Sequence, residues 1–338
     1  MNFPELKKVF KENIYFEDPN IIDVVMGSVV ANYFKHQRVS LIILNTAEPF
    51  LDILTYLPFS WYGVMRFFGI ESFDLNYLFW KLYRSESLRS NQIKITTTVI
   101  TNITPFLVHH RQKFFRMLNI FDAGKHKFIK FKKERIWTGE IGIIASTLSQ
   151  DTELMKNDFL MYRLPTFTQP EDLLFPQSTK MGYIKQTLWN AVNNYLREIK
   201  YKRFPKNIEI SQQYKERLEV LKKQSHHSIA FFKKLLSLGI GLAVVQEKEE
   251  FDDQIMDILT KVIWDSFPYN LSRILYMLGK INKKLTATEL SQLIDMRPHT
   301  IYDNLKRLAE KGIVTQNLRI SVSKEMRVGG KTYEWRLK

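Results

Sequence analysis

The sequence contains no cysteine, which excludes disulfide bonds, cysteine-ligated zinc and a cysteine nucleophile. It also lacks a run of about 18 consecutive apolar residues, the length that a membrane-spanning helix needs. The N-terminal segment MNFPELKKVFKENIYFEDPN carries charges throughout and has no apolar core of the kind found in secretion signals. We therefore expect a cytoplasmic protein that has no disulfides and does not contact a membrane.

Positive charge, in contrast, is abundant, with 50 lysines and arginines against 35 aspartates and glutamates, for a net charge of +15. The excess is concentrated near the C-terminus. Residues 271–338 contain 14 basic and 6 acidic residues, a net charge of +8. Such a local excess is expected of a protein that binds a polyanion. The alternative is that the charge serves solubility alone.

Strand-like and helix-like segments alternate over residues 1–167. The first 38 residues and the aromatic segment 47–90 are rich in helical patterns. The strand-like segments are 39–44, 93–100, 140–147 and 158–167. This alternation predicts an α/β fold with a largely parallel sheet flanked by helices.

The pattern changes after Pro170, and residues 180–267 are almost wholly helical in pattern. Changes of pattern near residues 170 and 268 indicate three domains. We expect an α/β domain over 1–170, a helical domain over 171–268 and a basic C-terminal domain over 269–338.

The segment KHKFIKFKKER at 125–135 mixes basic and apolar residues at a period close to two, which predicts a β-hairpin. Two interpretations remain open. In the first, Lys130, Lys132 and Lys133 contact a DNA backbone while Phe128, Ile129 and Phe131 act as apolar anchors. In the second, the lysines protect a solvated sheet edge from aggregation.

The C-terminal residues have the order of a winged helix-turn-helix. A helix over 272–281 precedes Thr286 and Glu289, which have the spacing of a capping box. Pro298 suits the first turn of the next helix, and Gly312 suits the position after its end. Two strand-like runs follow, as expected for a wing.

Exposed residues early in a recognition helix reach base edges, and neighbouring cations contact phosphates. We expect Ile301, Leu305 and Leu308 to form the buried side of this helix. The candidate DNA contacts are Arg297, His299, Thr300, Tyr302, Asp303, Asn304, Lys306 and Arg307 in the helix, and Lys324, Arg327 and Lys331 in the wing. The predicted partner is double-stranded DNA, and the alternative is a winged helix that contacts protein.

Several segments occur in an order that resembles certain AAA+ (P-loop) ATPases of phages, plasmids and other mobile elements, which are related to replicative helicases. The segments are Phe121-Asp122-Ala123-Gly124, WTGEIGIIAST at 137–147, NDFLMYRL at 157–164 and the terminal TYEWRL. The resemblance covers about residues 20–338. It implies an AAA+-like P-loop domain, a helical lid domain and a C-terminal winged helix, and it places the 125–135 hairpin where it can face a ring channel.

The same resemblance assigns positions around a nucleotide site. Residues 39–44 would precede the phosphate loop and residues 45–52 would form it. Residues 96–107 would hold the strand that carries an acidic magnesium ligand. Ser146 and Thr147 would occupy the sensor position, and Arg163 would lie near the arginine that completes a neighbour's site.

The residues at these positions depart from what the chemistry requires. A phosphate loop needs glycines, a lysine and a Ser/Thr hydroxyl, whereas this chain has Asn45, Thr46, Glu48, Pro49 and Phe50. Proline removes an amide donor, phenylalanine adds bulk and glutamate adds negative charge. The expected magnesium ligand is also missing, because the segment around Asn102 has no Asp or Glu. We therefore expect no ATP hydrolysis, no cofactor and no metal.

Taken together, the sequence predicts a DNA-binding protein of a replication or mobile-element system. Its catalytically inactive AAA+-like core would serve as a scaffold that assembles with itself or with an active ATPase paralogue. One alternative is a transcriptional regulator with an N-terminal ligand-sensing or oligomerisation domain. Another is an unorthodox DNA-stimulated ATPase. The composition is compatible with a prokaryotic source, including an archaeal virus or plasmid.

Overall fold

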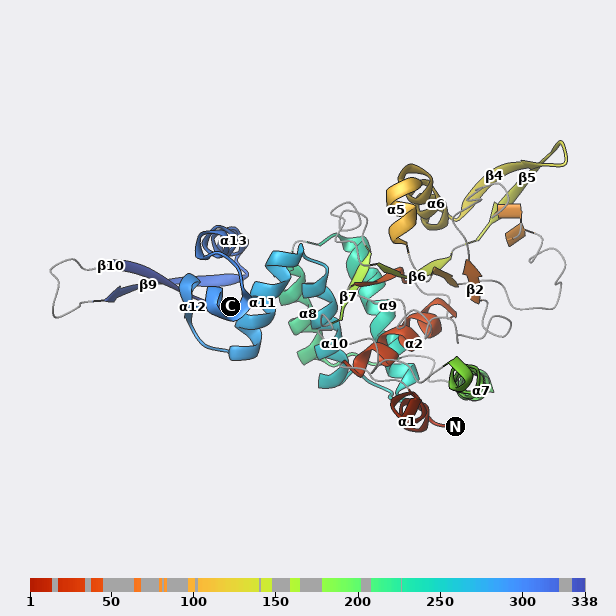
Figure 1. Cartoon of the computed structure of the whole chain (residues 1–338), viewed down its shortest axis with the longest axis horizontal. Helices are drawn as coiled ribbons and strands as arrows, with labels where there is room; N and C mark the ends of the chain where they lie inside the picture. Colours follow the sequence, from red (N-terminus) through yellow and green to blue (C-terminus); the bar gives the residue numbers. More distant parts are fainter. Residues whose placement is uncertain are drawn as a thin grey trace.

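The computed structural model describes most of the chain (Figure 1). The described residues are 1–13, 18–33, 38–44, 64–67, 79–80, 82–83, 97–100, 103–139, 141–147, 159–164, 178–201, 208–225, 227–321 and 330–337. They form a central parallel sheet with helices on both faces, a β-hairpin at one end and a small helical and β module at the other.

The sheet has five parallel strands in the order β2-β3-β6-β1-β7. The strands are β1 (Leu41–Leu44), β2 (Val64–Phe67), β3 (Thr97–Ile100), β6 (Gly142–Thr147) and β7 (Leu160–Arg163). The predicted parallel sheet and four of its strands are confirmed. Strand β2 lies inside the segment expected to be rich in helix. Its four residues, VMRF, are too few to show a period of two.

Alternate residues of the strands face two separate hydrophobic cores, as the period of two in a β-strand requires. Leu41 and Ile43 point to the face covered by α2 (Asn20–Tyr33) and α9 (Ile229–Val245). Ile42 and Leu44 point to the other face, toward α6 (Arg111–Ala123). Burial on both faces explains why the strands read as continuous apolar runs.

Helices α2 and α9 are mostly apolar and mostly buried, with Asp23, Ser28 and Asn32 as the buried polar residues of α2. They pack against each other at Gly27 and Gly241. A Cβ atom on Gly241 would lie 2.1 Å from the carbonyl oxygen of Gly27. The side chain of Asn32 then ties α2 to the start of β1, donating to the carbonyl of Val39 at 3.1 Å and accepting from its amide at 2.6 Å.

The remaining elements before the C-terminal module surround the sheet. They are α1 (Phe3–Asn13), α5 (Thr104–His109), β4 (Lys125–Lys130), β5 (Lys133–Thr138), α7 (Ser178–Tyr201), α8 (Gln212–Ser225) and α10 (Asp253–Asp265). Strands β4 and β5 form the predicted hairpin. One continuous core of buried residues runs from Phe3 to Trp335 and includes residues from all three expected domains.

Helix α10 covers the edge strand β7. The amide of Met161 donates to Ser266 Oγ at 3.1 Å, and the amide of Arg163 donates to Asp265 Oδ2 at 2.8 Å. Side chains at the end of a helix thus satisfy the outward N–H groups that an edge strand would otherwise leave open. This edge of the sheet is closed to pairing with another strand.

The C-terminal module contains three helices and a three-stranded antiparallel sheet in the order β8-β10-β9. Its elements are α11 (Tyr269–Ile281), β8 (Leu285–Thr286), α12 (Ala287–Ile294), α13 (Pro298–Glu310), β9 (Val314–Ser321) and β10 (Gly330–Leu337). The predicted capping box at Thr286 and Glu289 is present, and Pro298 begins α13. Among the described helices of the whole chain, none is long and apolar enough to span a membrane.

Candidate nucleic-acid interface and the carboxyl edge of the sheet

Helix α13 is held in one orientation by its apolar side. Ile301, Leu305 and Leu308 are fully buried, as predicted, at positions i, i+4 and i+7 of the helix. They pack into the core shared with α11, α12 and Trp335 of β10. The opposite side of the helix therefore faces solvent.

The solvent side of α13 carries most of the predicted DNA contacts. Arg297, Lys306 and Arg307 are exposed. His299, whose side chain is 88% exposed, pairs with Asp303 through Nδ1 and Oδ2 at 3.3 Å. The helix thus presents cations at both ends of this surface, with a histidine and a carboxylate between them.

Three other predicted contacts lie partly inside the module. Asn304 donates from Nδ2 to the carbonyl of Thr300 at 2.8 Å, and both residues are half-buried. The ring of Tyr302 lies 5.9 Å from that of Trp335 and 6.3 Å from that of Tyr333. These contacts help to position α13 against the sheet.

In sequence, the predicted wing contacts flank the tip of the β9–β10 pair. Lys324 and Arg327 lie outside the described residues. Lys331 pairs with Ile320 in the β9–β10 ladder, but its side chain is not among those described.

The carboxyl ends of three strands meet at one edge of the large sheet. Leu44, the last residue of β1, is in register with Thr147 of β6 on one side and with Arg163 of β7 on the other. In open parallel sheets, ligands bind at this edge where neighbouring connections diverge. The predicted loop residues Asn45, Thr46, Glu48, Pro49 and Phe50 follow β1, and Asn102 follows β3. All six lie outside the described residues.

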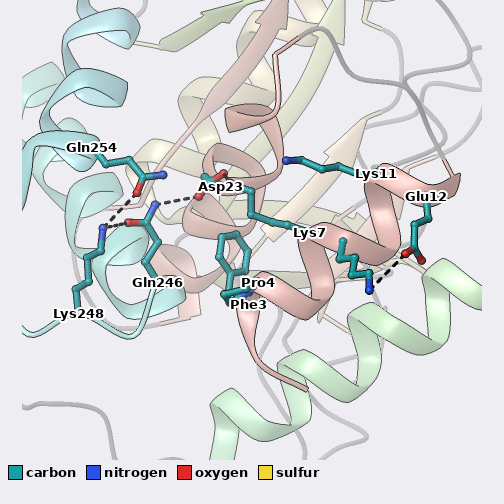
Figure 2. A pocket seen from close by; sticks show the side chains of 10 residues that line it. Phe3, Pro4, Lys7, Lys11, Glu12, Asp23, Gln246, Lys248 and Gln254 are labelled. Carbon is teal, nitrogen blue, oxygen red and sulfur yellow. Dashed lines mark hydrogen bonds and ion pairs between the residues drawn. The ribbon is translucent and has the colours of Figure 1, made fainter.

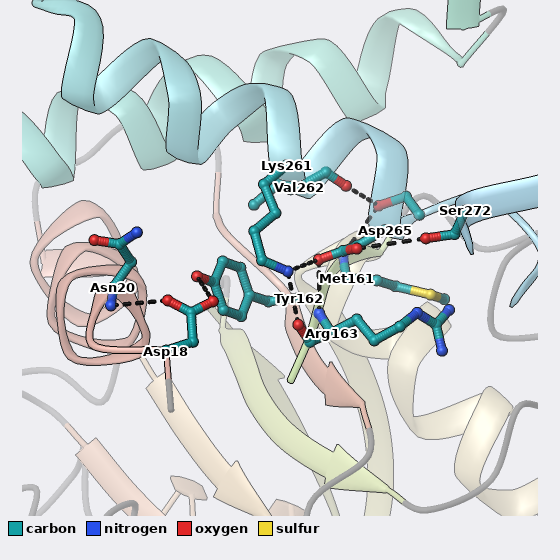
Figure 3. A network of polar contacts seen from close by, with 10 residues as sticks. Asp18, Asn20, Met161, Tyr162, Arg163, Lys261, Val262, Asp265 and Ser272 are labelled. Atoms are coloured by element: carbon teal, nitrogen blue, oxygen red, sulfur yellow. Dashed lines mark hydrogen bonds and ion pairs between the residues drawn. The ribbon is translucent and has the colours of Figure 1, made fainter. Parts of the chain in front are cut away.

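Arg163 is buried at this edge and belongs to a network that joins β7 to α10 (Figure 3). Asp265 Oδ2 accepts from the Arg163 amide and from Lys261 Nζ, the latter at 2.6 Å. Lys261 Nζ also donates to the Arg163 carbonyl at 2.7 Å and lies 4.3 Å from the centre of the Tyr162 ring. Lys261 and Asp265 are not among the predicted site residues, although their i, i+4 spacing is that of a helical ion pair.

Burial governs the protonation of this network. It raises the pKa of the Asp265 carboxyl, an effect that the neighbouring Lys261 ammonium opposes. It also raises the pKa of the Tyr162 hydroxyl, which donates to Asp18 Oδ2 at 2.7 Å and is further disfavoured from ionising by that carboxylate. These groups are engaged with one another, so their arrangement fixes the edge strand to the helices around it.

The β4–β5 hairpin has one buried side and one solvent side. Trp137 packs against Phe79 with ring centres 5.2 Å apart, and Phe128 packs against Tyr83 at 5.9 Å. Phe128 is thus a core residue that solvent does not reach, and its expected role as an apolar anchor for DNA is wrong. Ile129 and Phe131 are exposed, as are Lys132 and Lys133, whereas the side chain of Lys130 is not among those described.

A pocket of about 640 Å³ lies between α1, α2 and the turn that joins α9 to α10 (Figure 2). Its buried Asp23 accepts from Lys7 Nζ at 2.6 Å and from Gln246 Nε2 at 2.9 Å. Lys248 donates to Gln246 at 2.7 Å and pairs with Asp252. Carboxylates therefore pair with Lys7 and Lys248, and Glu12 pairs with Lys8 at 3.8 Å, while Lys11 adds a further cation to the lining.

Comparison of the sequence with models of known protein families finds no match, and comparison with curated proteins finds none either. The resemblance to AAA+ ATPases accordingly remains a prediction.

Proposed function

We propose that this chain is a DNA-binding protein that contacts duplex DNA through a C-terminal winged helix-turn-helix, with α13 as its recognition helix. The observation that carries the proposal is the division of α13 into two sides. Ile301, Leu305 and Leu308 are buried, while Arg297 and Lys306 are exposed. A helix fixed in this way can enter the major groove and present its cations to phosphates and base edges.

The rest of the module supports the same function. The short turn at 295–297 between α12 and α13 gives the spacing of a helix-turn-helix. Strands β9 and β10 follow as an antiparallel pair in the position of a wing. The net charge of +8 over residues 271–338 provides attraction to a polyanion.

In this proposal, the N-terminal part is an AAA+-like scaffold that does not hydrolyse ATP and that serves a replication or mobile-element system. The parallel sheet supports it, because β1 lies between β6 and β7 with Thr147 and Arg163 beside its carboxyl end. These are the positions that the resemblance assigns to the sensor and arginine residues. The unsuitable loop chemistry at Glu48 and Pro49 supports the absence of catalysis.

The affinity of the full chain for a labelled duplex, measured by fluorescence anisotropy, tests the proposal. We expect the double variant Lys306→Ala/Arg307→Ala to bind more weakly by about 1–3 kcal/mol for each side chain that touches DNA, or at least tenfold in Kd. The control is Lys215→Ala/Lys223→Ala on α8, which removes the same charge from exposed positions outside the module. Equal affinities for the two variants would contradict the proposal.

A transcriptional regulator that senses a small ligand is the second candidate, and the pocket beside α1 favours it. A volume of about 640 Å³ lies in the range of small-molecule sites. Under this function, filling the pocket with Pro4→Trp would change DNA affinity even though Pro4 is remote from α13. Unchanged affinity in a folded Pro4→Trp variant would exclude ligand control through this pocket.

A further inference from the structure

The β4–β5 hairpin and the C-terminal module lie at opposite ends of the longest axis of the molecule (Figure 1). The hairpin segment 125–138 contains six lysines and arginines and one glutamate. Each end of the molecule therefore carries its own concentration of positive charge, and the parallel sheet and its helices separate the two.

The strand register shows which hairpin side chains face solvent. Residues directly opposite each other share a face, so Ile129 with Glu134 and Ile136 with Lys127 form one face. All four are exposed, and the two isoleucines are diagonal neighbours on this face. On this face, Lys127 Nζ pairs with Glu134 Oε1 at 3.0 Å. The solvent side thus combines two apolar side chains with an ion pair, and the tip adds the exposed Lys132 and Lys133.

The turn of the hairpin holds Phe131 in an unusual conformation. Phe131 and Lys132 have φ angles of 53° and 58°, in a two-residue turn where Asn and Gly are preferred. A left-handed conformation costs roughly 1–2 kcal/mol for a residue that is not glycine. The turn nevertheless presents a phenylalanine that is 78% exposed. Strained residues of this kind persist mainly where they serve a function.

The base of the hairpin is anchored, which gives the tip a defined direction. Trp137 and Phe128 pack into the core beneath the sheet, and Arg135 lies 5.7 Å from the ring centre of Tyr83. A two-stranded hairpin is only marginally stable alone, so this packing is needed to keep it extended. The ring of Phe131 also lies 6.3 Å from that of Trp80, edge to face. These contacts fix the direction of the tip, where Phe131, Lys132 and Lys133 remain exposed.

Among polyanions, DNA fits this element best. The major groove admits a two-stranded β-ribbon, whose cations contact phosphates. Proteins that bind the minor groove insert apolar side chains between base steps, which an exposed phenylalanine could also do. A lipid surface would require a larger apolar area than two isoleucines and one phenylalanine provide.

We propose that the β4–β5 hairpin is a second DNA site and that one chain can hold two DNA segments at once, one at each end. This inference rests on the proposed function of α13, because that site supplies the other segment. Phe131 contacts bases, and Lys132 and Lys133 contact the backbone.

A capture assay with the full chain tests the inference. Protein is bound to a biotinylated duplex on beads and then exposed to a second, fluorescent duplex. The hairpin variant is Phe131→Asn/Lys132→Gly, which supplies the residues that the turn prefers and should therefore fold at least as stably as the native chain. We expect the native chain to capture the second duplex, and the hairpin variant to bind the beads normally but capture at least tenfold less.

The outcomes separate this inference from the function on which it rests. Equal capture by the hairpin variant would overturn it, since bridging would then come from two copies of the C-terminal module. A second measurement compares the binding of the native chain and of the hairpin variant to anionic lipid vesicles. If the hairpin variant lost vesicle binding but still captured DNA like the native chain, the inference would be overturned in favour of a membrane contact. If Lys306→Ala/Arg307→Ala bound the beads as well as the native chain, the function proposed for α13 would fail, whatever the hairpin variant did.

Discussion

At the scale of single residues, close approach between helices is set by two glycines. Gly27 and Gly241 face each other where α2 crosses α9, and both helices are buried there. The sequence shows two apolar helices, but it does not show that these glycines meet. The two glycines are about two hundred positions apart in the chain, and only packing brings them together.

We expect Gly241→Ala to destabilise the protein by at least the roughly 1–3 kcal/mol typical of overpacking, because the new Cβ would clash with the Gly27 carbonyl oxygen. Thermal unfolding would measure the effect. Gly279→Ala is the matched control, since Gly279 lies in α11, is exposed and would meet only Leu337 Cδ1 at 3.3 Å. A similar loss of stability in both variants would show that the crossing does not require glycine.

The Lys261–Asp265 pair gives a prediction with a pH dependence. Burial raises the pKa of Asp265 in the folded state, so the contribution of this group to stability decreases as pH rises above its unfolded pKa. The Lys261 ammonium stabilises the Asp265 carboxylate and so makes this loss of stability smaller. We therefore expect Lys261→Met to destabilise the fold by about 3–5 kcal/mol near neutral pH, where the carboxylate would be buried without its partner.

The destabilisation should be smaller in acid, because protonated Asp265 carries no charge. Chemical denaturation of Lys261→Met at two pH values, about 5 and about 8, measures the difference. The double variant Lys261→Met/Asp265→Asn should not show this pH dependence. A destabilisation that is equal at both pH values would contradict the assignment of Asp265 as the responsible group.

At the scale of secondary-structure elements, local sequence patterns correctly predicted the helices and strands whose pattern extends over enough residues to show its period. The run from Val39 to Leu44, the alternation in the hairpin and the capping box at Thr286 each have a local cause, and each element is present. Strand β2 was missed because four residues carry little periodicity. Strand β8 was missed because its two residues pair only through β10.

At the candidate sites, the features that the sequence did not predict likewise depend on contacts between distant parts of the chain. Helical periodicity identified the buried side of α13, but Tyr302 and Asn304 lie at its borders, where long-range packing decides exposure. The surroundings of Arg163 depend on Asp265, about one hundred positions later in the chain. No local pattern predicts such a contact.

The capping box provides a prediction for the C-terminal module. Thr286 Oγ1 accepts from the Glu289 amide at 3.2 Å, and Glu289 Oε2 accepts from the Thr286 amide at 2.7 Å. We expect Thr286→Ala to lower stability by about 1 kcal/mol, because the Glu289 amide at the start of α12 would no longer have its hydroxyl acceptor. Denaturant unfolding measures this change. Thr315→Ala is the control, because Thr315 lies on β9 outside any helix cap, and a comparable destabilisation there would contradict the assignment.

At the scale of the whole molecule, the arrangement of charge matters more than the total. A net charge of +15 would attract DNA from a distance wherever it were placed. The five parallel strands instead separate a basic hairpin from a basic C-terminal module (Figure 1). DNA affinity should therefore respond differently to salt and to mutation if binding uses two discrete sites than if it uses a nonspecific cationic surface.

The salt dependence of the proposed DNA binding distinguishes these cases. Each phosphate that a cation neutralises releases counterions, so log K falls linearly with log salt concentration, with a slope of about −0.9 for each phosphate. We expect Lys306→Ala/Arg307→Ala to make this slope less negative by about 2, because two cations no longer neutralise phosphates. The control Lys215→Ala/Lys223→Ala has the same net charge, so a surface that acted only through total charge would give both variants the same slope. Titrations of one duplex at four or more salt concentrations would separate the variants, and only a change confined to the α13 variant agrees with a discrete site.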